Sequence, residues 1–294
     1  MPLIAEMVLL EIVFVRHGIS CANAWGRKGG KPYQSAYPDP ELTEYGVGRS
    51  VEKGPLLASY VADKFPDGKY SIGASCMMRA QQTAHYMLAK TVGKPINIMP
   101  HIGELSNGIL PGYCNFPLSP ASQRKILGPE IVLGVDARGD VTGDELSNWP
   151  KFTKWAATAG TPFFTPTVNS DGETVHRAVI VGHSLLFKEI FGYTLNNNDV
   201  IFAKIDTGAG EGARIVKQEQ LSAWKDIPAD KEADVTGCRI QSKEELEDIA
   251  TKPMVGAART RRRKSRGSSR KNRSRSRRRS RQNNKSRRLR QAYL

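Results

Sequence analysis

An arginine and a histidine stand together at the end of a short apolar run near the start of the chain. Glu11 to Val15 is rich in β-branched residues, and Arg16-His17-Gly18 follows it at once. The run predicts a buried strand whose C-terminal end presents His17, and open α/β sheets bind their ligands at such ends. A lone histidine after a strand is more often a packing or surface residue, so the interpretation depends on the rest of the chain.

Two further segments repeat this arrangement of a strand followed by a reactive side chain. Residues 70 to 84 read as a strand and a serine followed by Arg79-Ala-Gln-Gln-Thr-Ala at the start of a helix. Residues 178 to 184 read as an apolar strand that ends in a second histidine, His183, and Glu104 lies between these two segments. Parallel strands would bring all of these side chains to one edge of a sheet.

Two arginines and two histidines suit the chemistry of a phosphomonoester. Its hydrolysis needs a group that receives the phosphoryl, cations that hold the oxygens and a proton for the leaving alcohol. The guanidinium groups of Arg16 and Arg79 each offer a fixed fork of donors that matches two phosphate oxygens. Arginines more often form surface salt bridges, but their placement at two separate strand ends favours a phosphate site.

The three motifs, in this order, resemble those of the histidine phosphatase superfamily, which includes phosphoglycerate mutases, acid phosphatases and many broad phosphomonoesterases. That family has a serine and an asparagine at set distances after the first histidine, and Ser20 and Asn23 hold those places. The resemblance covers about residues 8 to 207. It implies a phosphatase that uses neither a cofactor nor a metal.

The resemblance also implies a role for each residue of the site. His17 would be the nucleophile and form a phosphohistidine, while its other ring nitrogen donates to a backbone acceptor. His183 would be a second, cationic histidine hydrogen-bonded to the phosphoryl. Glu104 would protonate the leaving oxygen and then activate water. The phosphate would be bound by Arg16, Ser20, Asn23 and Arg79.

Some of these roles have open alternatives. Another carboxylate could take the place of Glu104, and the candidates are Glu41, Glu44, Asp140, Asp144, Glu145 and Glu173. Ser20 and Asn23 could instead cap a loop or helix. The remaining histidines show no ligand spacing with the pair and are interpreted as surface or packing residues: His85, His101 and His176.

Two departures bear on the reaction type. Ser184 follows the second histidine, where mutases commonly have glycine. Ile19 stands where the longer mutase signature has an acidic residue. Both differences favour hydrolysis of a phosphomonoester over phosphoglycerate mutase-type phosphoryl transfer, which remains the alternative.

The charge of the chain is concentrated at its C-terminal end. The 294 residues carry a formal net charge of +15, but residues 256–294 hold 18 Lys and Arg and no acidic residue, which leaves 26 basic and 29 acidic residues before them. This Arg/Ser-rich tail cannot bury enough apolar surface to offset its ordering entropy, so we expect it to be disordered. It could bind RNA or DNA, act as a targeting signal, or only keep the chain in solution.

The cysteines and the apolar segments bear on the compartment. Cys21, Cys76, Cys114 and Cys238 show no close pairing and no metal spacing, which favours reduced thiols but leaves an isolated disulfide open. Acidic residues interrupt the apolar N-terminus, and no apolar run is long enough to cross a bilayer. We therefore expect a soluble, intracellular protein without a membrane partner, either cytoplasmic or located in the nucleus or a nucleic-acid-containing particle.

The alternation of strands and helices predicts an α/β fold, a three-layer α/β/α arrangement around a mainly parallel sheet. Thr43 is a predicted N-cap, Gly54-Pro55 a predicted helix break, and residues 200 to 205 a predicted closing edge strand. We expect a catalytic domain over 1–225, a linker with a short helix over 226–255, and the basic tail over 256–294.

Two classes of function fit this organisation. The first is a cofactor-independent phosphatase that carries a basic tail. The second is a nucleic-acid-binding protein whose phosphatase-like domain serves only as a scaffold. The complete set of pocket residues favours the enzyme, while the tail indicates a further role.

Overall fold

The computed structural model describes residues 8–104, 113–138, 147–158, 161–208, 213–221, 227–240, 242–245 and 247. The chain divides into two compact units, Met1–Ala250 and Thr251–Leu294, and all described residues belong to the first. The predicted disordered tail at 256–294 lies outside the described residues.

A mixed sheet of eight strands forms the centre of the first unit. Its order is β4-β3-β2-β6-β1-β7-β8, with β5 paired to β6. The pairs from β4 to β1 are parallel, whereas β7, β8 and β5 pair antiparallel with their neighbours. The strands are β1 (Leu9–Arg16), β2 (Ser71–Ala74), β3 (Ile96–Ile98), β4 (Leu133–Asp136), β5 (Thr165–Val168), β6 (Thr174–Gly182), β7 (Val200–Asp206) and β8 (Arg214–Leu221).

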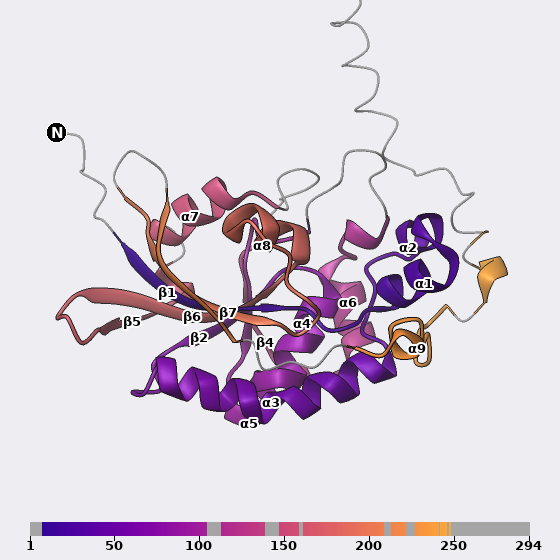
Figure 1. Cartoon of the computed structure of the whole chain (residues 1–294), viewed down its shortest axis with the longest axis horizontal. Helices are drawn as coiled ribbons and strands as arrows, with labels where there is room; N and C mark the ends of the chain where they lie inside the picture. The colour runs from indigo at the N-terminus through magenta and orange to yellow at the C-terminus, as the bar shows by residue number, and fades with distance from the viewer. Residues whose placement is uncertain are drawn as a thin grey trace, which may run out of the picture. The chain divides into compact units, whose positions relative to one another are not determined.

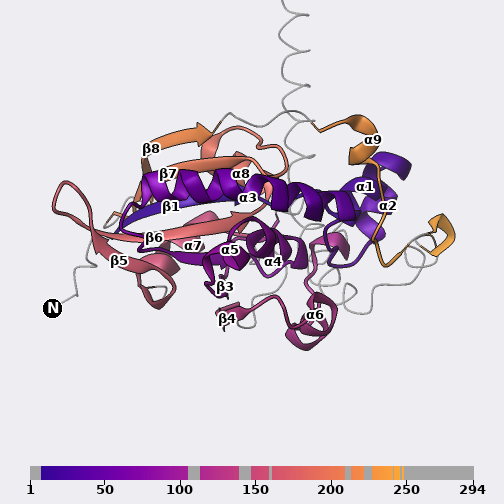
Figure 2. The same ribbon diagram turned by 90° about the horizontal axis from the view of Figure 1, so that it is seen from below.

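Helices cover both faces of this sheet, which confirms the predicted three layers (Figures 1 and 2). One face carries α3 (Glu44–Lys64), α4 (Met78–Ala84), the π-helical η1 (His85–Ala89) and α5 (Lys90–Val92). The other face carries α7 (Trp149–Ala157) and α8 (Ser184–Phe191). The remaining helices are α1 (Cys21–Gly29), α2 (Lys31–Ala36), η2 (Tyr113–Asn115), α6 (Pro120–Leu127), η4 (Thr161–Phe163) and α9 (Ala229–Glu232).

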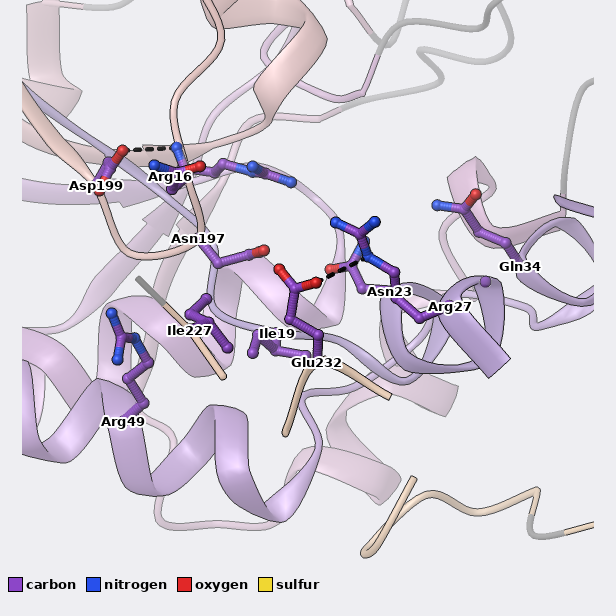
Figure 3. A pocket seen from close by; sticks show the side chains of 12 residues that line it. Arg16, Ile19, Asn23, Arg27, Gln34, Arg49, Asn197, Asp199, Ile227 and Glu232 are labelled. Carbon is purple, nitrogen blue, oxygen red and sulfur yellow. Dashed lines mark hydrogen bonds and ion pairs between the residues drawn. The ribbon is translucent and has the colours of Figure 1, made fainter. Parts of the chain in front are cut away.

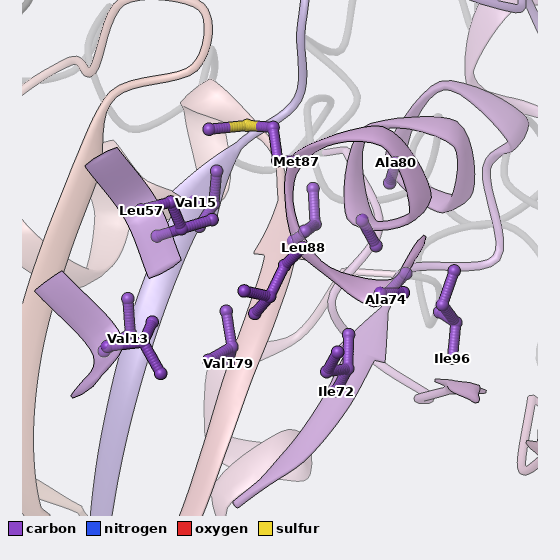
Figure 4. Packing of buried hydrophobic residues seen from close by; sticks show 14 of the residues in the cluster. Val13, Val15, Leu57, Ile72, Ala74, Ala80, Met87, Leu88, Ile96 and Val179 are labelled. Atoms are coloured by element: carbon purple, nitrogen blue, oxygen red, sulfur yellow. The ribbon is translucent and has the colours of Figure 1, made fainter. Parts of the chain in front are cut away.

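The side chains of β1 point alternately to the two faces of the sheet and divide the apolar core into two layers. Val13 and Val15 pack with Leu57 of α3 and with the helices after β2, as Figure 4 shows. Ile12 and Phe14 point to the opposite face, where they pack with α7 and α8. Successive side chains of a strand point to opposite faces, so the apolar residues from Ile12 to Val15 are covered on both sides of the sheet.

The structure confirms one predicted feature of the first long helix and corrects another. Thr43 is the N-cap of α3 and accepts from the backbone N–H of Gly46 at 3.0 Å. The break predicted at Gly54-Pro55 is wrong, because α3 continues through both residues. Gly54 is buried against the backbone of Met87, and Pro55 lies on the exposed face. Packing against η1 holds the helix where propensity alone would interrupt it.

The predicted closing edge strand is also corrected. β7 occupies that position in the chain, but β8 pairs with it along its whole length and forms the edge instead. Most β8 side chains are exposed, so its sequence lacks the apolar alternation that marks a half-buried strand.

A disulfide ties the segment 227–240 to the first helix. Cys21 and Cys238 are bonded although 217 positions separate them, while Cys76 and Cys114 are free and buried. The expectation of reduced thiols is therefore wrong for Cys21 and Cys238, since the fold brings together cysteines whose pairing the spacing does not show. The segment lies within the stretch predicted as a linker. In the same stretch, Ser242 and Glu245 form a capping box through two reciprocal hydrogen bonds of 3.1 Å.

Candidate active site

Two histidines face each other at the C-terminal ends of adjacent parallel strands. Arg16, the last residue of β1, is in register with Gly182, the last residue of β6, and His17 and His183 each follow by one position. The backbone N–H of His17 donates to the Gly182 carbonyl at 3.1 Å. The ring centroids of the two histidines are 5.0 Å apart, and both residues are buried.

Backbone contacts fix the orientation of the His17 ring. Its Nδ1 lies 2.7 Å from the Gly18 carbonyl oxygen, so Nδ1 carries the hydrogen and donates. The other nitrogen, Nε2, then keeps its lone pair. Asn197 Nδ2 donates to the carbonyl oxygens of His17 and Gly18 at 2.8 and 3.0 Å, and Thr83 Oγ1 accepts from the Gly18 N–H at 2.9 Å.

Burial and the two arginines hold both histidines neutral. Loss of solvent lowers the pKa of His17 well below its ordinary value, and the charges of Arg79 and Arg16 lower it further. The same causes, together with His17, lower the pKa of His183. A neutral His17 has the free electron pair that a nucleophile needs. For His183, the lowered pKa runs against the cationic state that the resemblance implies.

His183 has one engaged and one unengaged ring nitrogen. Its Nε2 lies 2.6 Å from Ser75 Oγ, at the end of β2. Its Nδ1 is buried without a hydrogen-bond partner among the described residues. In the tautomer in which Ser75 donates to Nε2, Nδ1 carries a hydrogen that only a bound ligand would accept.

Glu104 brings a carboxylate to the histidine pair. Its Oε1 accepts from the Leu185 N–H, in the first turn of α8, at 3.1 Å. One ligand atom from each of His17, Glu104 and His183 lies within 4.8 Å of the others. Such a trio could hold a metal ion, but the neighbouring guanidinium groups of Arg16 and Arg79 favour an anion at this place.

Loops hold the two arginines in fixed positions. Arg16 Nη1 donates to the Leu195 carbonyl, while its Nε is buried with no partner in the described part of the chain. Arg79 Nη1 donates to the Cys114 carbonyl at 2.7 Å and Nη2 to Asn115 Oδ1 at 3.1 Å. Residues of η2 therefore hold one edge of the Arg79 guanidinium.

Ser20 and Asn23 form a capping box at the start of α1. The Ser20 hydroxyl accepts from the Asn23 N–H at 3.3 Å, and Asn23 Oδ1 accepts from the Ser20 N–H at 3.2 Å. The structure thus shows the capping role that the sequence left open for both. Asn23 also lines the cavity described next, whereas Ser20 does not.

A cavity of about 520 Å³ reaches Arg16, the residue directly before His17 (Figure 3). Its wall comes from the loop after β1, from α1, α2 and α3, from the loop before β7, and from the segment 227–240. The lining residues are Arg16, Ile19, Asn23, Gly26, Arg27, Gln34, Arg49, Asn196, Asn197, Asp199, Ile227 and Glu232.

Three of the alternative carboxylates are engaged elsewhere or exposed. Glu41 accepts from Arg239 Nε through both oxygens at 2.8 Å. Glu44 is exposed at the start of α3, and Glu173 pairs with Lys204 at 3.2 Å. The other candidates, Asp140, Asp144 and Glu145, lie outside the described residues. Of the carboxylates described, Glu104 is the one grouped with both histidines.

The other histidines do not join this group. His85 is buried in η1 with its ring against Tyr86. His176 lies inside β6, opposite Pro166 of β5 and Leu10 of β1. His101 has a positive φ of 61° just after β3.

Sequence reasoning missed Ser75 and Asn197 as functional residues. Ser75 belongs to the quoted second motif, but nothing in its spacing predicts that it faces His183. Asn197 lies in a run of three asparagines before β7, which reads as an ordinary loop. Its position follows from the antiparallel pairing of β7 with β1.

In the described part of the chain, the helices are all too short or too polar to span a bilayer.

No family model matches the chain, and no curated protein matches it by sequence. Among solved structures, it is similar to a phosphoserine phosphatase from Entamoeba histolytica in complex with 3-phosphoglyceric acid, at 17% identity and a TM-score of 0.37, over 72% of this chain and 98% of that chain. A mycobacterial glucosyl-3-phosphoglycerate phosphatase is similar at 15% identity and a TM-score of 0.39, over 71% of this chain and 97% of that chain. A phosphoglycerate mutase from Bacillus anthracis is similar at 15% identity and a TM-score of 0.37, over 78% of this chain and 97% of that chain. These proteins are members of the histidine phosphatase superfamily, the family that the three motifs of this chain resemble.

Proposed function

We propose that the chain is a phosphomonoester hydrolase of the histidine phosphatase superfamily that works through a phosphohistidine at His17. The observation that carries the proposal is the His17 ring itself. It is buried, held neutral and fixed by the Gly18 carbonyl, with Arg16, Arg79, His183 and Glu104 around it. That set supplies a nucleophile, cations for the phosphoryl oxygens and a proton donor.

In the first step, His17 Nε2 attacks the phosphorus and a P–N bond forms. The P–O bond to the alcohol breaks, and its electron pair leaves with the oxygen, which takes a proton from the protonated Glu104. The arginines and His183 Nδ1–H hold the equatorial oxygens, where charge grows in the transition state.

In the second step, water attacks the phosphohistidine. The Glu104 carboxylate takes a proton from that water, a P–O bond forms and the P–N bond breaks. Inorganic phosphate leaves, His17 regains its lone pair, and Glu104 is again protonated. One carboxylate thus serves as acid and then as base.

A phosphate-release assay over a panel of phosphomonoesters tests this proposal. We expect turnover by the native chain, loss of several orders of magnitude in His17→Ala, and native rates in the matched control His176→Ala. Release without dependence on His17 would contradict the proposal. Conversion of 3-phosphoglycerate to its 2-phospho isomer without phosphate release would instead establish the mutase alternative.

We further propose that the basic tail, residues 256–294, binds RNA or DNA and directs the chain to the nucleus or to a nucleic-acid-containing particle. Its charge supports this: 18 cationic side chains and no acidic one would release many counterions from a phosphate backbone. With Tyr293 as its one aromatic residue, base stacking would contribute little, so binding should be insensitive to sequence.

A further inference from the structure

The cavity that reaches Arg16 has a wall that the catalytic motifs do not supply. Ile227 and Glu232 come from the segment 227–240, more than 200 positions after His17 in the sequence. Figure 3 shows the carboxylate of Glu232 meeting the guanidinium of Arg27 across the cavity, with Arg16 beyond them. The two side chains form an ion pair of 3.1 Å.

Several contacts hold this segment in place. The disulfide joins Cys238 to Cys21 in the first turn of α1. The Thr236 carbonyl accepts from the Glu44 N–H at 3.0 Å, and Arg239 pairs with the buried Glu41 at 2.8 Å. The backbone of the segment that carries Glu232 is therefore tied to this side of the cavity.

The charges of the lining favour an anionic or polar occupant. Three arginines line the cavity, Arg16, Arg27 and Arg49, against two carboxylates, Asp199 and Glu232. The other polar lining groups are the neutral amides of Asn23, Gln34, Asn196 and Asn197. Burial raises the pKa of Asp199, and the nearby charges of Arg16 and Arg49 oppose that rise. The charges of Arg16 and Arg49 thus act on Asp199, and Glu232 offsets Arg27.

The ion pair between Arg27 and Glu232 is weak enough to be displaced. The Arg27 side chain is 64% exposed and that of Glu232 30% exposed. Exposed pairs contribute roughly 0 to 1 kcal/mol, because water screens them. Displacing Glu232 from Arg27 would therefore cost a substrate anion little free energy.

We propose that this cavity is the leaving-group site and that Glu232 sets its specificity by competing for Arg27 with a second anionic group on the substrate. The inference rests on the proposed function. The substrate class is a phosphomonoester whose alcohol carries a carboxylate or a further phosphate. The phosphoryl group lies at the histidine pair and the second anion lies at Arg27.

Phenyl phosphate and 3-carboxyphenyl phosphate test the proposal, because they differ by one carboxylate on similar leaving groups. We expect the native chain to have a higher kcat/KM for the carboxylated substrate. Arg27→Gln should remove that preference and leave kcat/KM for phenyl phosphate unchanged. Glu232→Gln should raise kcat/KM for the carboxylated substrate about two- to five-fold and leave that for phenyl phosphate unchanged.

Two controls separate the proposed competition for Arg27 from a general effect of removing a surface charge. Glu52→Gln, which removes the ion pair between the exposed Glu52 and Lys53 on α3, should change kcat/KM for neither substrate. In the double variant Arg27→Gln/Glu232→Gln, kcat/KM should equal that of Arg27→Gln alone, since Glu232 competes with the substrate only for Arg27.

The outcomes distinguish the two proposals. Failure to release phosphate from either substrate would contradict the proposed function. Turnover with equal kcat/KM for both substrates, or an equal change of both in Glu232→Gln, would overturn the specificity role of Glu232 and leave the hydrolase intact.

Discussion

Replacing Asp39 by Asn should destabilise the chain and loosen the Arg79 side of the site. The Asp39 carboxylate is fully buried and accepts from the Met78 N–H at 3.0 Å, the Leu118 N–H at 2.8 Å and Gln123 Nε2 at 2.6 Å. Met78 is the residue before Arg79, and Leu118 follows the η2 loop that holds the Arg79 guanidinium. One carboxylate thus fixes both elements around that arginine.

The expected loss of stability follows from the hydrogen bonds that each carboxylate oxygen of Asp39 accepts. Oδ1 receives one donor and Oδ2 receives two. In Asp39→Asn, the amide oxygen can replace Oδ2, but the NH₂ group would then face the Met78 N–H. A buried donor left without an acceptor costs about 1–3 kcal/mol, and the remaining bonds lose the contribution of a charged acceptor. We therefore expect a loss of about 2–4 kcal/mol in the free energy of unfolding.

Urea denaturation measures this loss, with Asp63→Asn as the control. Asp39 has a positive φ of 35°, a region that asparagine adopts as readily as aspartate, so backbone strain does not confound the comparison. The Asp63 side chain is 73% exposed, and its replacement should change stability by less than about 0.5 kcal/mol. Asp39→Asn should also raise KM for phenyl phosphate. A variant as stable as Asp63→Asn would refute the reasoning.

Four further predictions concern the site, the disulfide and the tail. Glu104→Gln should slow alkyl phosphates far more than aryl phosphates in steady-state assays, and equal losses would assign the proton transfer to another carboxylate. Arg79→Gln should raise the pKa of His17, because the Arg79 charge lowers it; as the pH falls, His17 of the variant should become protonated at a less acidic pH than in the native chain, which NMR titration measures. Reduction of the Cys21–Cys238 disulfide should lower the free energy of unfolding by about 5 kcal/mol in the chain-entropy model, since the bond spans 217 positions; a change below about 1 kcal/mol would contradict this. A chain ending at Met254 should keep its phosphatase turnover and lose most of its salt-sensitive affinity for RNA or DNA, and undiminished binding would contradict the role of the tail.

The catalytic motifs were predictable because each lies in a short window of sequence. An apolar strand and the reactive residue after it are neighbours in the chain, so Arg16, His17 and His183 could be placed at strand ends before the sheet was known. The three layers follow from the same alternation of strands and helices.

Features that depend on distant contacts were not predictable in this way. The bond between Cys21 and Cys238, the contact of Ser75 with His183 and the wall supplied by Glu232 all join residues far apart in sequence. The continuity of α3 through Pro55 likewise depends on tertiary packing against η1. The lowered pKa of His183 follows from burial and the nearby arginines, which a motif does not show.

Trapping the phosphoenzyme tests the central claim most directly. Rapid quench of the native chain with a phosphate-labelled substrate should give a base-stable, acid-labile label, and mass spectrometry should locate it at His17. The label should be absent from His17→Ala and present in His176→Ala. A label that persists in His17→Ala, or that survives acid as a serine ester would, would contradict a phosphohistidine at His17.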